Sequence, residues 1–140
     1  ACFGAPFMVH HPFKYAQMLK VRLMQRGAKV WMVNTGWTGG PFGIGKRISI
    51  QHTRALLDAA LTGKLDNVEY TIDPVFGVEV PKSCEGVPAN ILDPANTWPS
   101  REEYNQRVRS LASRFIENFE LLTGEEAGAR GLEIHGPKLR

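Results

Sequence analysis

Residues 33–48 read VNTGWTGGPFGIGKRI, and the predicted fold rests on this stretch. It holds five glycines within ten positions, follows an apolar strand-like stretch and leads into a helix-like one. Strand, glycine loop and helix in this order let backbone N–H groups approach a phosphate. Gly40, Gly45 and Lys46 have the spacing of a Walker A loop, but Arg47 stands where Ser or Thr would bind Mg²⁺. Taken alone, this incomplete pattern favours an ordinary glycine-rich connection over a nucleotide site.

The composition bounds the class of protein. With 140 residues, 43% of them apolar and 22% charged, the chain is ordinary for a single globular domain. The net charge of +3 comes from scattered Lys and Arg residues, which argues against a nucleic-acid partner. No stretch approaches the roughly 18 apolar residues of a transmembrane helix, so we expect no membrane segment. Cys2 and Cys84 lie in unrelated contexts without metal-ligand spacing, which favours reduced thiols and a cytoplasmic protein.

Hydrophobic periodicity predicts a mixed α/β fold in the first half of the chain. A helix with one buried face is expected over residues 12–26, with Gly27 as its terminator. Residues 28–33 form a nearly continuous apolar run, which predicts a strand buried on both faces of a mainly parallel sheet. After the glycine stretch, residues 53–61 have the spacing of a helix that ends at Gly63.

The second half of the chain predicts a hairpin, a long loop and a long helix. Residues 68–80 contain two short strands broken at Asp73–Pro74. Residues 81–99 are rich in proline and predict a long irregular surface segment. Ser100 and Glu103 have the spacing of a capping box, which begins a strongly periodic helix that runs to Gly124. Residues 125–140 are weakly patterned, and we expect a mobile tail there.

The residue types alone offer no catalytic set. None of the four histidines has a partner at metal-ligand spacing, and the Asp residues in Asp-Asn and Asp-Pro pairs are explained by turns. Trp31 is expected to pack in the core, whereas both core packing and base stacking remain open for Trp37. The chain therefore carries a fragment of a nucleotide site, and we expect no metal ligands within it.

Many short motifs of this chain resemble, in the same order, those of ATP-dependent phosphoenolpyruvate carboxykinases. They are Cys2–Phe7, His11–Pro12, Tyr15–Ala16, 33–50, Thr53–Ala55, Leu65–Asn67, Asp73–Gly77, Val80–Pro81, Gly86–Pro88, Leu92–Pro94, Asn96–Trp98, Phe115–Phe119 and Gly136–Leu139. An ordered set that covers nearly the whole chain is far more specific than any single motif. The resemblance implies the carboxyl-terminal quarter of such an enzyme, which would explain why the chain begins at Ala1. Residues 1–124 would be the C-terminal portion of its ATP-binding domain and residues 125–140 a C-terminal tail.

The resemblance also implies an activity and its cofactors. The whole enzyme would convert oxaloacetate and ATP into phosphoenolpyruvate, CO₂ and ADP, the entry step of gluconeogenesis, with Mg²⁺ or Mn²⁺. The family's phosphate loop, its metal ligands and its oxaloacetate-binding residues would lie in the remainder of the polypeptide. Catalytic residues are therefore not expected here, and this fragment alone would be inactive. The Walker-like spacing from Gly40 to Lys46 would not be the phosphate cradle.

Carried over residue by residue, the resemblance implies that this chain binds the adenosine end of ATP. Arg47 could stack its planar guanidinium on adenine or reach an oxygen of the ribose or phosphate. Ile48 would supply an apolar wall and a backbone polar group for the base edge, and Thr53 a hydroxyl near a helix start. Phe7 is equally compatible with lining the same pocket and with core packing.

An alternative from another class is a stand-alone nucleotide-binding module without catalysis. Tight ATP binding by the isolated chain would favour that alternative. Insolubility of the isolated chain would favour the fragment, because removal of upstream strands exposes apolar surface.

Overall fold

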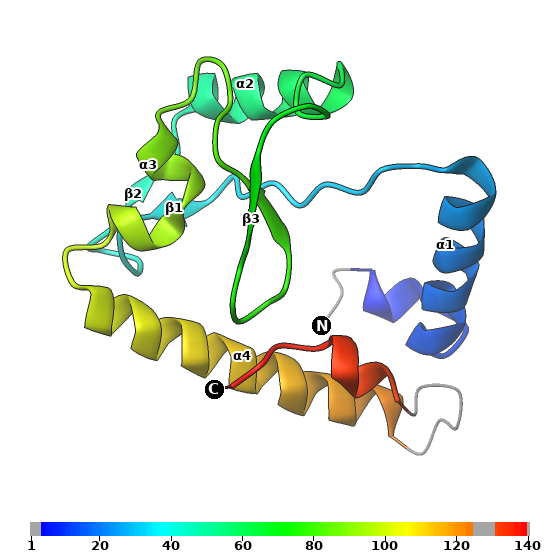
Figure 1. The fold of residues 1–140 in the computed structure, drawn as a ribbon. Coiled ribbons are helices and arrows are strands. Elements are labelled where there is room, and N and C mark those ends of the chain that lie inside the picture. The colour runs from blue at the N-terminus through cyan, green and yellow to red at the C-terminus, as the bar shows by residue number, and fades with distance from the viewer. Residues whose placement is uncertain (1–3, 125–130, 140) are drawn as a thin grey trace.

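Two helices on opposite sides of a small β-hairpin form the body of the molecule. The computed structural model describes residues 4–124 and 131–139. The helix α2 (Ile50–Leu61) lies on one side and α4 (Arg101–Thr123) on the other, with the β3 (Tyr70–Ile72) strand between them (Figure 1). The strand β4 (Glu79–Pro81) pairs with β3 in antiparallel register, Tyr70 opposite Pro81.

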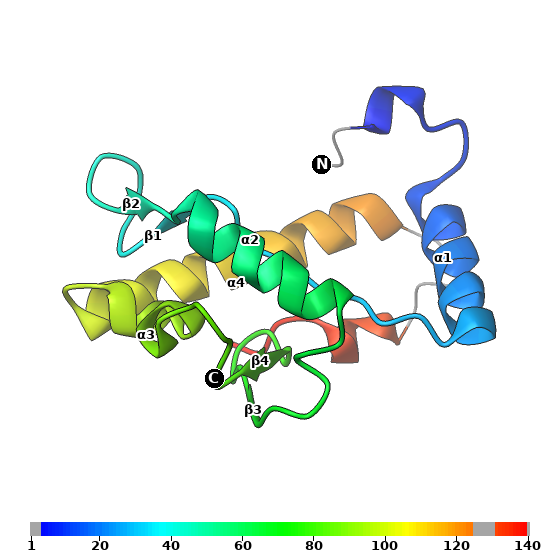
Figure 2. The ribbon, with the colours of Figure 1, turned by 90° about the horizontal axis from the view of Figure 1, so that it is seen from above.

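A third helix, α1 (Pro12–Arg26), stands apart from this body (Figures 1 and 2). His11 Nδ1 accepts a hydrogen bond from the N–H of Phe13 at the start of α1, and Gly27 ends the helix with φ +59°. Only glycine adopts this left-handed conformation without strain, so the predicted helix and its terminator are confirmed. A short 3₁₀ turn, η1 (Ala5–Phe7), precedes α1.

The face of α1 that the sequence predicts to be buried is exposed. No residue of α1 is buried, and its apolar side chains Met18, Leu19 and Val21 are each about half exposed or more. The expectation of a buried face is therefore wrong for this structure. The physical reason is that α1 makes few contacts with the other described elements, so little apolar surface lies against its side chains.

The predicted strand over residues 28–33 is also absent. The segment is irregular, Val30 and Met32 are 67% and 79% exposed, and both described sheets are antiparallel pairs rather than a parallel sheet. A strand needs a neighbour for its N–H and C=O groups, and no described strand pairs with this segment. Trp31 nevertheless packs on the core, with its ring centroid 6.4 Å from that of Tyr70, as expected.

The core is small. Its buried residues are Ala59, Leu65, Cys84 and Val87, which join α2 to the loops on either side of the β3–β4 hairpin. The predicted hairpin is confirmed, and Asp73 shapes its turn. The Asp73 Oδ1 atom accepts hydrogen bonds from the N–H groups of Val75 and Phe76, at 2.9 and 2.7 Å. This Asx turn explains the break between the two strands.

The proline-rich segment is more ordered than the sequence predicts. It contains a short helix, α3 (Ala89–Leu92), and a 3₁₀ turn, η2 (Pro94–Thr97). Asp93 Oδ1 accepts from the N–H of Ala95 at 3.0 Å, and Pro94 occupies the first turn. Proline and aspartate therefore begin helical turns here, because proline presets φ and aspartate supplies a cap.

The predicted cap of α4 is confirmed, whereas the cap of α2 lies at a residue that the sequence analysis does not name. Ser49 caps α2, which begins three residues earlier than predicted, and Ser100 Oγ accepts from the N–H of Glu103 at 3.3 Å to begin α4. A 3₁₀ turn, η4 (Leu132–His135), follows in the tail. The backbone N–H of Lys138 donates to Val75 O at 2.7 Å, so the tail's end is attached to the hairpin turn. The remainder of the predicted tail, residues 125–130 and 140, lies outside the described residues.

No described helix is both long and apolar enough to cross a membrane.

Replacement of the α4 cap tests this reading of the helix. Ser100→Ala removes the acceptor for the N–H of Glu103, and we expect the free energy of unfolding to fall by about 1 kcal/mol. The measurement is urea unfolding followed by circular dichroism. Ser110→Ala, at an exposed position inside the same helix, is the matched control and should cost nothing, because alanine is the better helix former. Equal losses in both variants would contradict the cap.

Candidate functional site

The glycine stretch folds as a β-hairpin that leads into α2. The strands β1 (Trp37–Thr38) and β2 (Lys46–Arg47) pair in antiparallel register, Trp37 opposite Arg47. The expected order of strand, loop and helix is therefore replaced by two short strands, the turn between them, and a helix. The difference arises because the loop folds back on β1 instead of passing directly into α2.

Close backbone approach requires glycine inside this hairpin. A Cβ at Gly45 would overlap the carbonyl oxygen of Gly40 and would lie 2.7 Å from that of Thr38. Real Cβ atoms essentially never come so near an oxygen, and backbone cannot move aside as a flexible side chain can. The absence of a side chain at Gly45 therefore allows the two strands to close.

The turn of the hairpin directs backbone donors inward. The N–H groups of Ile44 and Gly45 donate to Pro41 O at 3.1 and 2.9 Å. A phosphate cradle needs several such N–H groups to converge on the ligand. Two amides of the Walker-like stretch are instead paired within the chain.

The hairpin rests on the turn η2. Thr97 Oγ1 donates to Pro94 O at 2.7 Å, so Thr38 Oγ1 is the donor in its 2.8 Å contact with Thr97 Oγ1. A Cβ at Gly39 would lie 2.9 Å from Thr97 O, which shows how closely the two backbones approach. These contacts, made across nearly sixty residues of sequence, hold the hairpin in place on the body of the molecule.

Three of the four predicted site residues lie together at the junction of the hairpin and α2. Arg47 is exposed on β2, and Ile48 is partly buried with its N–H donating to Gly36 O at 2.9 Å. Thr53 is partly buried in the first turn of α2, and its N–H donates to the carbonyl oxygen of Ser49 at 3.0 Å. One short segment, fixed by the hairpin at one end and the helix cap at the other, thus presents all three.

Phe7 lies elsewhere. It ends η1, which lies beside α1 and across the molecule from β1 and β2 in both views (Figures 1 and 2). Its side chain is 85% exposed, so Phe7 neither packs in the core nor meets the other three residues in this structure.

The sequence analysis did not predict that Trp37 and Phe42 form an exposed aromatic pair. The rings of Trp37 and Phe42 meet edge to face with centroids 5.4 Å apart, and Phe42 is 84% exposed. Trp37 stands opposite Arg47 in the strand register, which places a large aromatic group and a cation on the same short ribbon. The sequence signal was the presence of two aromatic residues inside a glycine-rich stretch, where core packing cannot explain both.

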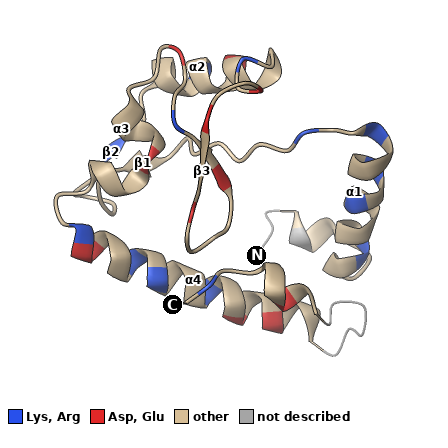
Figure 3. Ribbon diagram, in the orientation of Figure 1, with Lys and Arg blue, Asp and Glu red and all other residues tan. Residues whose placement is uncertain are grey.

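Charged residues are spread over several elements of the molecule (Figure 3), and the surroundings shift the pKa values of Cys84 and Lys64. Burial raises the pKa of the Cys84 thiol, with a smaller contribution from the Glu85 carboxylate, so this thiol is not an activated nucleophile. The carboxylates of Glu85 and Asp58 raise the pKa of Lys64, which lies between them on the surface. Within residues 4–124 and 131–139, no three His, Cys, Asp or Glu residues gather as a metal site.

Comparison with known proteins connects these features to a family. The family model described as phosphoenolpyruvate carboxykinase matches residues 1–90. The chain is 52% identical to the ATP-dependent phosphoenolpyruvate carboxykinase of Brevibacillus brevis, over 99% of this chain and 26% of that protein. It is 57% identical to one from Moorella thermoacetica (84% and 22%) and 54% identical to one from Caldanaerobacter subterraneus (85% and 23%). The chain thus spans about a quarter of the length of these curated relatives.

A methyl group at Gly45 tests the closure of the hairpin. We expect Gly45→Ala to lower the free energy of unfolding by about 1–3 kcal/mol, because the added Cβ overlaps backbone that cannot yield. The matched control is Gly36→Ala, whose Cβ would meet only the Asn34 side-chain oxygen, at 3.3 Å. The measurement is denaturant unfolding of both variants, and a Gly45→Ala protein as stable as the control would show that the strands do not close as described.

Proposed function

The chain belongs to the ATP-dependent phosphoenolpyruvate carboxykinase family, and from this membership we propose that it is the adenosine-binding part of such an enzyme. The complete polypeptide would convert oxaloacetate and ATP into phosphoenolpyruvate, CO₂ and ADP. Loss of CO₂ from oxaloacetate leaves an enolate oxygen, which attacks the γ-phosphorus of ATP and displaces ADP. The reaction would serve gluconeogenesis in the cytoplasm.

The chemical step requires groups that the remainder of the polypeptide would supply. A divalent cation, Mg²⁺ or Mn²⁺, would neutralise charge on the transferred phosphoryl group, and the described residues contain no cluster that could hold it. We propose that the residues that bind the cation and oxaloacetate lie in the remainder of the polypeptide, and that the 140 residues alone would be inactive. This chain would contribute orientation, which holds the γ-phosphate in line with the enolate.

The segment from Arg47 to Thr53 carries the proposal. Its three candidate residues supply a cation, an apolar side chain and a hydroxyl, which are the groups that adenine and ribose require. The exposed Arg47 guanidinium is available for stacking on a base or for an oxygen of ribose or phosphate. The segment is held by the Ile48–Gly36 hydrogen bond and the Ser49 cap, so ATP would meet it already ordered. Phe7 is not part of this proposal, because η1 lies away from the β1–β2 hairpin.

We infer that residues 1–124 are the C-terminal portion of the ATP-binding domain and that the rest of the enzyme covers their exposed apolar surface. The uncovered face of α1 and the unpaired segment of residues 28–33 support this, because a folded protein rarely leaves such groups in water. In the complete enzyme, residues 28–33 would find strand partners and form the buried strand that their sequence predicts. Residues 125–140 would be the C-terminal tail.

Substitution of Arg47 tests the adenosine role in the complete enzyme. We expect Arg47→Ala to raise the Michaelis constant for ATP about tenfold, which corresponds to about 1.4 kcal/mol of binding, and to leave that for oxaloacetate unchanged. Steady-state kinetics with each substrate varied in turn gives both constants.

The control for Arg47 is its neighbour on the same strand. Lys46→Ala removes an equal charge from β2, but successive strand residues point to opposite faces. We expect it to change neither Michaelis constant by more than about twofold. Equal effects of Arg47→Ala on both substrates, or equal effects of the two variants on ATP, would contradict the proposal.

A further inference from the structure

The turn η2 lies between the β1–β2 hairpin and the start of α4 (Figure 1). The residues proposed to bind adenosine do not include it, yet its last residue, Thr97, contacts Thr38 of the hairpin across nearly sixty residues of sequence. Both threonines are partly buried, so water replaces a lost hydrogen-bond partner poorly there. This contact joins the hairpin to the body of the molecule.

A short chain of hydrogen bonds runs from β1 to the backbone of η2. Thr38 Oγ1 donates to Thr97 Oγ1 at 2.8 Å, and Thr97 Oγ1 donates to Pro94 O at 2.7 Å. The Thr97 hydroxyl thus accepts one hydrogen bond and donates another, so it cannot rotate without breaking at least one of them. Its orientation is therefore fixed from both sides.

The position of Thr97 is set by elements other than the hairpin. Asp93 caps η2, and its Oδ2 atom accepts a hydrogen bond from the Asn96 side-chain amide at 3.1 Å. The next residue after η2, Trp98, meets Tyr104 of α4 edge to face, with ring centroids 6.0 Å apart. The cap and the aromatic pair hold η2 on α4, so Thr97 offers the hairpin a fixed point of attachment.

On the hairpin side, the contact lies beside the proposed adenosine segment. Thr38 stands opposite Lys46 in the strand register, next to Arg47. Both strands have two residues, and an isolated two-stranded hairpin is only marginally stable in water. A Cβ at Gly39 would lie 2.9 Å from Thr97 O, so the backbones of the two elements also lie close together. The direction of β2 therefore depends on where η2 holds β1.

We propose that Thr97 is a positioning residue for ATP: through Thr38 it holds the β1–β2 hairpin so that Arg47 and Ile48 face the nucleotide. This inference rests on the proposed adenosine role of these two residues and assigns a function to a residue that does not touch ATP itself. A hairpin released from η2 would sample further orientations, and only the competent fraction would bind ATP. The apparent affinity for ATP would fall, whereas phosphoryl transfer within the bound complex would proceed at its usual rate.

Replacement of the hydroxyl in the complete enzyme is the test. Thr97→Val exchanges the hydroxyl for a methyl group, and we expect the Michaelis constant for ATP to rise about fivefold. We expect kcat and the Michaelis constant for oxaloacetate to change by less than about twofold. Thr97→Ser keeps the hydroxyl and should restore most of the affinity for ATP. Instability alone would lower kcat through a smaller number of active molecules and leave both Michaelis constants unchanged, so this pattern separates positioning from folding.

The partner threonine provides a second, independent variant. Thr38→Val should also raise the Michaelis constant for ATP, and the double variant should raise it no further than Thr97→Val alone, because the shared hydrogen bond is already lost. Thr71→Val is the control, since it makes the same exchange at an exposed position of β3, in the other described sheet. It should leave every constant unchanged.

Hydrogen exchange followed by mass spectrometry reports on the hairpin without ATP. Thr97→Val should accelerate exchange at the amides of residues 37–48 and leave the amides in the middle of α4 unchanged.

Four outcomes would overturn this inference alone. They are additive effects of Thr38→Val and Thr97→Val, an equal effect of Thr71→Val, unchanged exchange in residues 37–48, and a Michaelis constant for ATP that Arg47→Ala raises and Thr97→Val does not. An unchanged Michaelis constant for ATP in Arg47→Ala would overturn the adenosine proposal, and this inference with it.

Discussion

The proposed site depends on one close contact, between Gly45 and the carbonyl oxygens of Gly40 and Thr38. Because Gly45 has no side chain, β2 can return along β1, and Arg47 then stands opposite Trp37. The chain continues within two residues into the Ser49 cap of α2. The positions of Arg47, Ile48 and Thr53 therefore follow from a backbone approach that no other amino acid permits.

The β1–β2 hairpin is well packed on one side only. On one side the hairpin rests on η2 through Thr38 and Thr97, and α2 contributes Ala59 to the small core. On the other side, α1 and residues 28–33 leave apolar groups in water. A chain with a small core and an uncovered apolar face is better explained as part of a larger fold than as a module on its own. This contrast supports the fragment over the stand-alone alternative.

The sequence predicts structure correctly where a cap, a turn residue or a helix terminator decides it. Gly27 ends α1, Asp73 turns the β3–β4 hairpin and Ser100 begins α4, since each depends on neighbours a few residues away. The strand predicted for residues 28–33 is absent because an apolar run shows that a segment can be buried but supplies no strand to pair with. The part of the chain that the structure describes contains no partner strand for it. The sequence does not reveal the order in the proline-rich segment, because proline and aspartate are common both in loops and at the start of helical turns.

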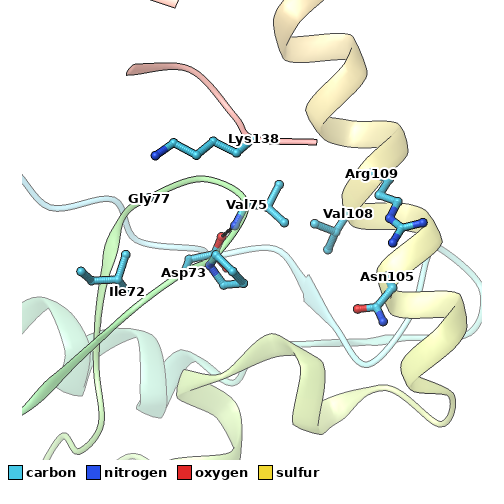
Figure 4. Close-up of a pocket in the computed structure, with 9 residues that line it drawn as sticks. Ile72, Asp73, Val75, Gly77, Asn105, Val108, Arg109 and Lys138 are labelled. Atoms are coloured by element: carbon cyan, nitrogen blue, oxygen red, sulfur yellow. Dashed lines mark hydrogen bonds between the residues drawn. The ribbon is translucent and has the colours of Figure 1, made fainter. Parts of the chain in front are cut away.

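The candidate site shows the same division. Arg47, Ile48 and Thr53 are close in sequence, so their proximity followed from the chain itself. The position of Phe7 depends on where η1 packs on the rest of the molecule, and no neighbouring residue in the sequence indicates that position. The cleft lined by Asp73, Asn105 and Lys138 lies between the β3–β4 turn, α4 and the C-terminal segment (Figure 4). It joins three segments that are distant in the sequence, so it could be found only in three dimensions.

Photoaffinity labelling with 8-azido-ATP, followed by mass spectrometry of the labelled peptides, tests most directly whether this chain holds adenosine. We expect that the complete enzyme is labelled within residues 37–53 and that excess ATP prevents the labelling. Labelling confined to peptides outside these 140 residues, with the same protection by ATP, would contradict it.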